Sequence, residues 1–365
     1  MGEREPLIEG NKGTDIYEET EWNLSVRAKV ALSVVGVVLA GFFLYLFIFL
    51  LPEIFIPQRT TLVDIPRITA LDVELTPVRG PNAAIGDFEV VGHADGSSRK
   101  KVSRLILVGD VHGHYDNFIK LLKEAKYNHK RDHLLVLGDF ITKGPDSMKV
   151  LNYLVDNKID CILGNHEYEV LQNYASFHGL QSPGFGFTTN RFGVKSESEF
   201  SLAKKLQPEQ VKYINQCSVI KTLGEMPIGE GKETEVSTFD SAEGIAVHAG
   251  LRWDLELTEQ DPNDNLEMRA YIGPYFNRTT NDPTRPNAVA WSKIYNKKQE
   301  KKHSKDQLVV YYGHDARSGL NLHKFTKGLD SGCGSGRKLT AMIIWNEIDK
   351  NGRKVFHESP LQVKC

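Results

Sequence analysis

Asp110 and His112 are the first residues in this chain whose types and spacing suggest chemistry. They follow the apolar run Arg104–Val108, which predicts a buried strand, and Gly109 marks the point where that strand ends. A carboxylate and an imidazole at the end of a strand can both face one cation. One such pair is weak support for a metal site, so its meaning depends on whether similar residues follow other strands.

Four later apolar runs also end in residues that bind metals. The runs at 133–137, 159–163, 244–247 and 308–312 are followed by Asp139, by Asn165 and His166, by His248 and by His314, respectively. Helical periodicity at 115–128 and 147–157 separates the first three strands, and this alternation predicts an α/β fold. Ligands bind beyond the carboxyl ends of strands in such sheets, so we expect these side chains to meet in one crevice.

The residue types in this set suit two divalent cations. Carboxylate, imidazole and amide ligands fit zinc, manganese, iron or cobalt better than they fit an all-oxygen calcium site. Two cations close together share a carboxylate and promote in-line attack on phosphorus. The sequence therefore predicts a dinuclear centre for phosphoryl chemistry.

The motifs G-D-V-H-G, G-D-F-I-T-K-G and G-N-H-E, followed by H-A-G and G-H, resemble those of the metallophosphoesterase family, which includes the calcineurin-like Ser/Thr protein phosphatases. The resemblance covers about residues 104–345. It implies an α/β sandwich of two mixed β-sheets flanked by helices. It also implies that Asp110 and His112 bind the first metal, that Asp139 bridges both metals, that Asn165, His248 and His314 bind the second, and that His166 is the general acid.

The second motif departs from the protein-phosphatase pattern G-D-Y-V-D-R-G. Thr142 stands where an Asp would orient His166, so His166 needs another support or a lower working pH. Lys143 replaces an Arg that grips phosphate, and it offers a compact charge in place of a bidentate fork. These changes disfavour a phosphoprotein substrate and resemble the ApaH-like, diadenosine-tetraphosphatase branch. Arg252 and Arg317 are further candidates for binding phosphate, with surface ion pairs as their alternative role.

The combination of an ApaH-like domain with an N-terminal anchor resembles the fungal vacuolar endopolyphosphatases. The resemblance implies hydrolysis of internal phosphoanhydride bonds in inorganic polyphosphate by a hydroxide held between two metals, with zinc as the implied metal. Phosphatases of diadenosine or nucleoside polyphosphates, or of phosphoproteins, are the alternative. A membrane-tethered adaptor with a vestigial phosphatase domain is disfavoured, because every metal-ligand position of the family carries a residue that can bind a metal.

Residues 30–51 form an uncharged apolar run that predicts a transmembrane anchor. The run is long enough to cross a hydrocarbon core about 30 Å thick, whereas the apolar part of a cleaved signal peptide is shorter. Arg27 and Lys29 precede the run, which places residues 1–29 in the cytosol and the catalytic part in the lumen. In this tail, Glu3–Ile8 fits an acidic dileucine signal read by adaptor coats, which implies a vacuolar or endosomal destination.

For the rest of the chain we predict a lumenal stem at 52–102, a catalytic domain at 103–358 and a C-terminal tail at 359–365. Asn277 begins a glycosylation sequon, which agrees with a lumenal domain. The formal net charge of −2 gives no global attraction to polyanions, so we expect no nucleic-acid partner, and any phosphate site must be local. The four cysteines show no paired spacing that indicates a disulfide framework. One disulfide is possible, but we expect a fold that does not rest on it.

Overall fold

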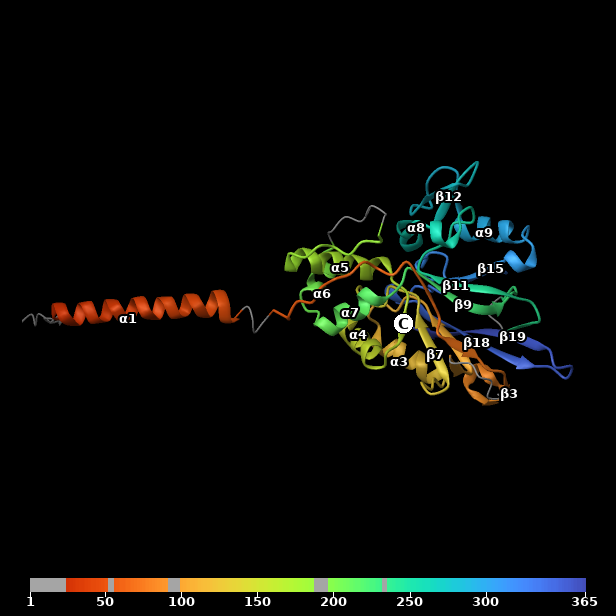
Figure 1. The fold of residues 1–365 in the computed structure, drawn as a ribbon, viewed down its shortest axis with the longest axis horizontal. Coiled ribbons are helices and arrows are strands. Elements are labelled where there is room, and N and C mark those ends of the chain that lie inside the picture. Colours follow the sequence, from red (N-terminus) through yellow and green to blue (C-terminus); the bar gives the residue numbers. More distant parts are fainter. Residues whose placement is uncertain (1–23, 52–55, 91–98, 187–195, 232–234) are drawn as a thin grey trace, which may run out of the picture. The chain divides into compact units, whose positions relative to one another are not determined.

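Two six-stranded mixed sheets form the framework of the larger of two units, Pro57–Cys365 (Figure 1). In the computed structural model, residues 24–51, 56–90, 99–186, 196–231 and 235–365 are described. One sheet has the order β10 (Val236–Thr238), β19 (Lys354–Lys364), β18 (Lys338–Ile348), β6 (Arg104–Val108), β7 (Asp132–Val136), β8 (Asp160–Cys161). The other has the order β1 (Ile68–Ala70), β9 (Ile220–Pro227), β11 (Ser241–Val247), β15 (Leu308–Tyr312), β17 (Thr326–Gly328), β16 (Asn321–Leu322).

Within each sheet, the strands that carry the predicted ligands run parallel to one another. β6 pairs in parallel with β7 and β7 with β8, while β11 pairs in parallel with β15. Parallel neighbours end on the same edge of a sheet, so the residues that follow them lie close together. The five predicted strands are present in the predicted order along the chain, although the third is shortened to the two residues of β8.

Alternating side chains of β6 explain the layers of the fold. Leu105 and Leu107 belong to an apolar cluster shared with β15 of the other sheet, whereas Ile106 and Val108 pack in a second cluster with helical residues such as Phe118. All four strand residues are fully buried, because each faces either the other sheet or the helices. The predicted two-sheet sandwich flanked by helices is therefore confirmed.

Helices and small sheets complete this unit. The helices are α3 (Tyr115–Glu124), α4 (Ser147–Asp156), α5 (Asn165–His178), α6 (Glu197–Ala203), α7 (Pro208–Gln216), α8 (Pro262–Glu267) and α9 (Trp291–Gln299). A three-stranded sheet contains β13 (Arg278–Thr280), β12 (Ala270–Ile272) and β14 (Ala288–Ala290). In Figure 1, α8, α9 and β12 lie together, and α3, α4, α5 and α7 form a separate group.

The predicted stem is largely part of the folded unit, so that boundary was wrong. β2 (Val73–Leu75) pairs with β5 (Lys100–Val102), β3 (Val78–Asn82) pairs with β4 (Asp87–Val90), and β1 forms an edge of a main sheet. Ile65 and Val78 are buried in the core. Short strands rich in Pro and Gly carry a weak sequence signal, which is why this region resembled a linker.

The predicted C-terminal tail is also wrong, because residues 359–364 continue strand β19. β19 pairs with β18 along its whole length, from Lys338 opposite Lys364 to Ile348 opposite Lys354. The disulfide Cys333–Cys365 fastens the end of this hairpin.

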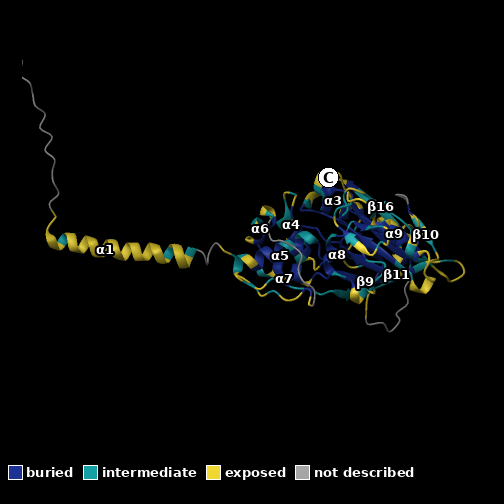
Figure 2. Ribbon diagram, turned by 90° about the horizontal axis from the view of Figure 1, so that it is seen from above, coloured by how far each residue is buried: buried dark blue, intermediate teal, exposed yellow. Residues whose placement is uncertain are grey.

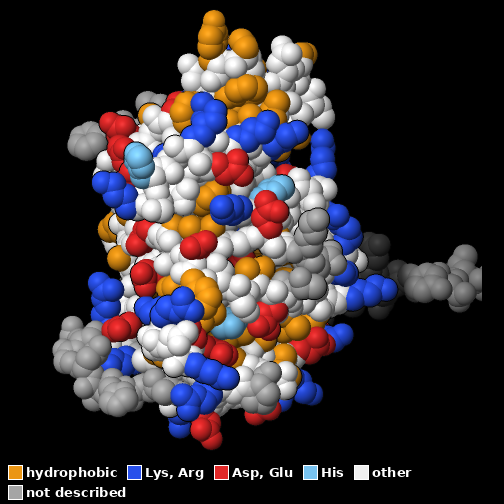
Figure 3. All heavy atoms as spheres, turned by 90° about the vertical axis from the view of Figure 1, so that its right-hand side faces the viewer, with side chains coloured by type: hydrophobic (Ala, Val, Ile, Leu, Met, Phe, Trp, Pro, Cys, Tyr) orange, Lys and Arg blue, Asp and Glu red, His pale blue; other side chains and the backbone are white. Residues whose placement is uncertain are grey.

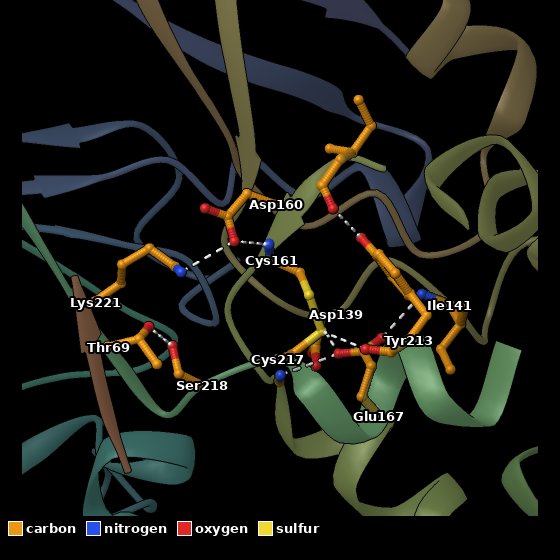
Figure 4. The surroundings of a disulfide bond; sticks show 12 residues. Thr69, Asp139, Ile141, Asp160, Cys161, Glu167, Tyr213, Cys217, Ser218 and Lys221 are labelled. Atoms are coloured by element: carbon orange, nitrogen blue, oxygen red, sulfur yellow. Dashed lines mark hydrogen bonds and ion pairs between the residues drawn. A yellow bond between two sulfur atoms is a disulfide. The ribbon is translucent and has the colours of Figure 1, made fainter. Parts of the chain in front are cut away.

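All four cysteines form disulfides, contrary to the expectation from their spacing. Cys161 on β8 is joined to Cys217 at the end of α7 (Figure 4), and Cys333 is joined to Cys365. The partners are far apart in sequence and meet only through the fold, so spacing alone could not reveal them.

The smaller unit, Met1–Ile56, contains the apolar helix α1 (Val26–Tyr45), continued by a π-helical turn over Leu46–Leu50. Residues 26–50 are long and apolar enough to cross a membrane, and Figure 2 shows the helix exposed along its length. The candidate membrane span is thus confirmed, beginning at Val26 instead of residue 30. The candidate sorting signal Glu3–Ile8 lies outside the described residues.

Candidate active site

The loops that follow five strands bring all the predicted metal ligands together. Asp110 and His112 follow β6, Asp139 follows β7, Asn165 and His166 begin α5 after β8, His248 follows β11 and His314 follows β15. Except for His248, which is fully buried, they line a cavity of about 150 Å³. The crevice predicted from the sequence therefore exists.

Asp139 lies at the centre of two groups of potential ligands. Its Oδ2 is 3.7 Å from His112 Nε2, and its Oδ1 is 3.3 Å from His248 Nε2. One group combines Asp139 with His112 and His166, and the other combines it with His248 and His314; within each group the ligand atoms lie within 4.8 Å of one another. Asn165 Oδ1 lies 3.0 Å from His248 Nε2, on the side of the second group. A shared carboxylate between two ligand groups is the arrangement of a dinuclear centre.

The buried carboxylates at this site repel one another. Burial raises the pKa of Asp110 well above its usual value, and the charges of Asp330 and Asp139 raise it further. Burial acts in the same direction on Asp139, but the imidazoles of His248 and His166 hold its pKa well below the usual value. Buried anions require compensation, which a cation between them provides.

Three imidazole rings are oriented by backbone carbonyl groups. His248 Nδ1 is 2.8 Å from Leu137 O, His112 Nδ1 is 3.3 Å from Ile141 O, and His314 Nε2 is 3.2 Å from Glu267 O. A ring N–H that donates to a carbonyl leaves the other ring nitrogen free to bind a cation. The rings are therefore prepared as metal ligands.

The backbone at the site is strained and tightly packed. His112, Asp139 and His314 have φ angles of 47°, 48° and 66°, in the left-handed region that residues other than glycine avoid. A Cβ on Gly313 would lie 2.1 Å from Asp110 Oδ1, and one on Gly164 would lie 2.3 Å from Asp139 N. Gly313 and Gly164, which precede the ligands His314 and Asn165, are thus required by the close approach of neighbouring loops.

Glu167 holds the loop that carries Asp139. Its carboxylate accepts N–H bonds from Asp139 at 2.6 Å, Ile141 at 3.1 Å and Gly164 at 3.1 Å, two of which are visible in Figure 4. Burial, with the nearby charge of Asp139, raises its pKa to about 7. The sequence prediction omitted Glu167, although it stands next to His166 in the G-N-H-E motif and that position was the available signal.

Glu199 on α6 supplies the support that Thr142 cannot give to His166. His166 Nδ1 lies 2.6 Å from Glu199 Oε1, while the hydroxyl of Thr142 is buried without a hydrogen-bond partner among the described residues. Burial lowers the pKa of His166, but Asp139 and the hydrogen bond to Glu199 outweigh this effect and raise it above its usual value. No motif surrounds Glu199, so its role could not be predicted from local sequence.

Two basic side chains among the described residues line the cavity, but only one of them was predicted. Lys143 Nζ lies 2.9 Å from His112 Nε2, and Arg269 donates to His314 O at 2.9 Å. Arg252 is turned away into an ion pair with Asp254, and Arg317 is exposed; neither lines the cavity. Proximity in sequence to a ligand did not determine which arginine reaches the site.

Asp330 is a third acidic residue that the prediction missed. It lines the cavity, is buried, and accepts the N–H of Gly332 at 3.0 Å. Burial raises its pKa. It lies in the stretch G-L-D-S-G-C at residues 328–333, for which no role was predicted.

Residues 103–318 match the model of the family described as calcineurin-like phosphoesterase. The chain belongs to this family. It is accordingly a metal-dependent phosphatase, with the α/β fold, ligand groups and central carboxylate described above.

Individual relatives fall into two groups. The chain is 28% identical over 291 residues to the zinc-dependent endopolyphosphatase of Saccharomyces cerevisiae, covering 71% of this chain and 80% of the relative. It is 37% identical over 287 residues to a symmetrical bis(5'-nucleosyl)-tetraphosphatase of Buchnera aphidicola, covering 71% of this chain and 98% of the relative. A crystal structure assigned to the diadenosine tetraphosphatases superposes with a TM-score of 0.54 at 20% identity, covering 82% of this chain and 98% of that one, which shows a common fold.

The residues present fit the divalent metals that this calcineurin-like fold implies. The donor set consists of imidazole, carboxylate and amide groups, and the buried carboxylates need a positive charge. The ammonium of Lys143 beside His112 shows that a cation can be accommodated there.

Proposed function

We propose that this phosphatase hydrolyses internal phosphoanhydride bonds of inorganic polyphosphate, with zinc as its metal. The observation that carries the proposal is the lining of the cavity. Its described residues are acids, imidazoles, one amide, the cations Lys143 and Arg269, and small residues, with no Phe, Tyr or Trp on which a nucleobase could stack. The similarity to the yeast zinc-dependent endopolyphosphatase supports the same substrate and metal.

The proposed roles follow from the two ligand groups. Asp110, His112 and Asp139 would hold one metal, and Asp139, Asn165, His248 and His314 would hold the other. When bound, the two cations would neutralise charge on the scissile phosphate and acidify a water molecule.

The other side chains would position the substrate and move a proton. Lys143 and Arg269 would bind non-reacting phosphate oxygens, since both project into the cavity. His166, held through Nδ1 by Glu199, would use Nε2 to protonate the departing oxygen of the chain.

We also propose that the enzyme is a single-pass membrane protein with its catalytic unit in the vacuole lumen. The candidate span, the basic residues before it and the acidic dileucine pattern support this topology. Two disulfides support an oxidising compartment.

The decisive experiment incubates the full chain in detergent with Zn²⁺ and long-chain polyphosphate and separates the products by size on a gel. Endo-cleavage gives chains of intermediate length at early times. Release of terminal phosphate alone, or no shortening, would contradict the proposal.

The second candidate function is hydrolysis of dinucleoside polyphosphates, favoured by the similarity to the Buchnera tetraphosphatase. Diadenosine tetraphosphate and a phosphopeptide in the same assay separate these activities. A kcat/KM for diadenosine tetraphosphate above that for polyphosphate would favour the second candidate.

A further inference from the structure

A second hollow opens beside the active-site cavity, between the start of α4 and α6. It has a volume of about 520 Å³, against about 150 Å³ for the cavity that holds the ligands. Residues 142–149 line one side, and Ser198, Ser201, Leu202 and Lys205 line the other. We call it the α4–α6 groove. Lys143 lines both hollows, so they meet at its side chain.

The charges on this groove are mainly positive. Its charged lining residues are Lys143, Lys149, Lys205 and Asp146. Lys149 pairs with Asp146 at 2.9 Å and keeps 61% of its side chain exposed, while Lys205 is exposed and forms no ion pair with any described residue. The chain as a whole carries a net charge of −2, and positive and negative side chains are interspersed on the face seen in Figure 3. The excess of lysine in the groove is therefore a local feature that can attract an anion.

The chemistry of the groove fits a chain of phosphates better than a nucleotide. Its described lining contains lysines and hydroxyl groups of Ser and Thr, which bind phosphate oxygens, and no aromatic side chain that would stack on a base. The ammonium group of lysine sits on a flexible side chain, so it can bind phosphates at different positions along a polyanion. It discriminates poorly between ligands of different shape.

An enzyme that cuts internal bonds must accommodate the substrate on both sides of the scissile phosphate. A cavity closed around one phosphate would admit only a chain end. The groove that continues from Lys143 provides an open path for the rest of the chain, next to the proposed phosphate-binding residue.

We propose that the α4–α6 groove binds the segment of polyphosphate that leaves the metal centre past Lys143. This inference rests on the proposed polyphosphatase function and assigns Lys149 and Lys205 as binding residues for the chain. Neither lines the cavity that contains the ligands, so their removal should affect long substrates selectively.

The test compares Lys149→Ala/Lys205→Ala with Lys120→Ala/Lys123→Ala in the full chain in detergent. The control pair lies on α3, outside the groove; Lys120 pairs with Glu124 as Lys149 pairs with Asp146, and Lys123 is exposed like Lys205. For long-chain polyphosphate, the groove variant should raise KM roughly three- to tenfold with unchanged kcat, and high salt should reduce the difference. KM for tripolyphosphate, which is too short to fill the groove, should change less than about twofold in either variant.

An unchanged KM for long chains, or an equal rise in the control variant, would overturn the inference. If the wild-type protein hydrolyses diadenosine tetraphosphate but no polyphosphate, the proposed function fails and the groove is tested by inhibition. Long-chain polyphosphate should then inhibit diadenosine tetraphosphate hydrolysis, and the groove variant alone should raise its inhibition constant. Equal inhibition of wild type and groove variant would reject the groove as well.

Discussion

His166 joins the metal centre to a helix that no motif identifies. Its Nε2 lies 3.8 Å from Asp139 Oδ2, and its Nδ1 lies 2.6 Å from Glu199 Oε1. An imidazole held between two carboxylates has a fixed tautomer and a stabilised protonated form, which a general acid requires. Glu199 thus replaces, from a different element, the acid missing at Thr142.

Replacing Glu199 by Gln should lower kcat for polyphosphate about 10- to 100-fold. The neutral amide stabilises protonated His166 less well, so the pKa of His166 falls and the alkaline limb of the pH–rate profile moves to lower pH. Steady-state kinetics against pH would show both effects. p-Nitrophenyl phosphate, whose leaving group needs little protonation, should lose less activity.

Glu197→Gln is the matched control, because Glu197 is exposed on the same helix. It should retain wild-type kinetics. If Glu199→Gln reduced the rates for both substrates equally, proton transfer through His166 would not be the step that depends on Glu199.

Removing the shared carboxylate with Asp139→Asn should abolish high-affinity binding of both metals and reduce kcat at least about 1,000-fold. Metal analysis of the purified protein measures the first effect and the polyphosphate assay the second. Asp116→Asn, at an exposed position on α3, should keep the wild-type metal content. Retention of two metals by Asp139→Asn would contradict the bridging role.

The predictable part of the site is the part encoded by adjacent residues. A glycine, a ligand and a preceding apolar run are neighbours in sequence, so Asp110, Asp139 and His248 could be identified before the fold was known. Glu199 reaches His166, and Arg269 reaches the cavity, through tertiary packing, which leaves no local pattern. Arg252 shows the converse, because an ion pair with Asp254 turns it away from the ligands beside it.

At the scale of elements, the long apolar strands and amphipathic helices were predictable, whereas short pairings were not. β8 has only two residues, and β1 joins its sheet through three. Such strands are defined by hydrogen bonds to β7 and β9, so their own side chains say little about them. The described residues 57–90 and 99–102 therefore have the composition of a linker, although β1 forms a sheet edge and β2 to β5 pair in two small sheets.

β8 also contains an ionic contact between elements. Asp160 Oδ1 lies 3.0 Å from Lys221 Nζ on β9, and Asp160 Oδ2 lies 3.3 Å from His133 Nε2 on β7. The contact with Lys221 is drawn in Figure 4. Burial raises the pKa of Asp160, but these two partners lower it below its usual value of 3.8. A carboxyl group with a depressed folded-state pKa stabilises the protein above its unfolded-state pKa, and this contribution is lost as pH falls through the folded-state value.

Asp160→Asn should therefore lower the free energy of unfolding by about 1–3 kcal/mol near pH 7, and the difference from wild type should shrink below about pH 3.8. Urea unfolding of the full chain in detergent at several pH values would measure this. Asp156→Asn, at an exposed position on α4, should show no such difference. A pH-independent effect would show that the charge of Asp160 is not responsible.

At the scale of the whole molecule, the sequence predicted one membrane segment and one catalytic fold. The described residues contain one candidate membrane span, and the family match shows the catalytic fold. The proposed orientation across the membrane rests on the charges that flank the helix and can be tested through Asn277. This residue is exposed and begins the sequon, so a lumenal catalytic unit should carry a glycan there. Endoglycosidase treatment should increase gel mobility of the wild type and leave Asn277→Gln unchanged. Wild-type protein without a glycan would contradict the proposed orientation.

The pairing of β6 with β18 has a consequence for the order in which the protein is made. Val108 lies opposite Ala341, and Gly109 N–H donates to Thr340 O, so the first ligand loop is held by a strand synthesised after every proposed ligand. Until β18 emerges from the ribosome, one edge of β6 is unpaired and open to association with other chains. We therefore expect that nascent chains ending before residue 338 contain the complete ligand set yet bind no metal.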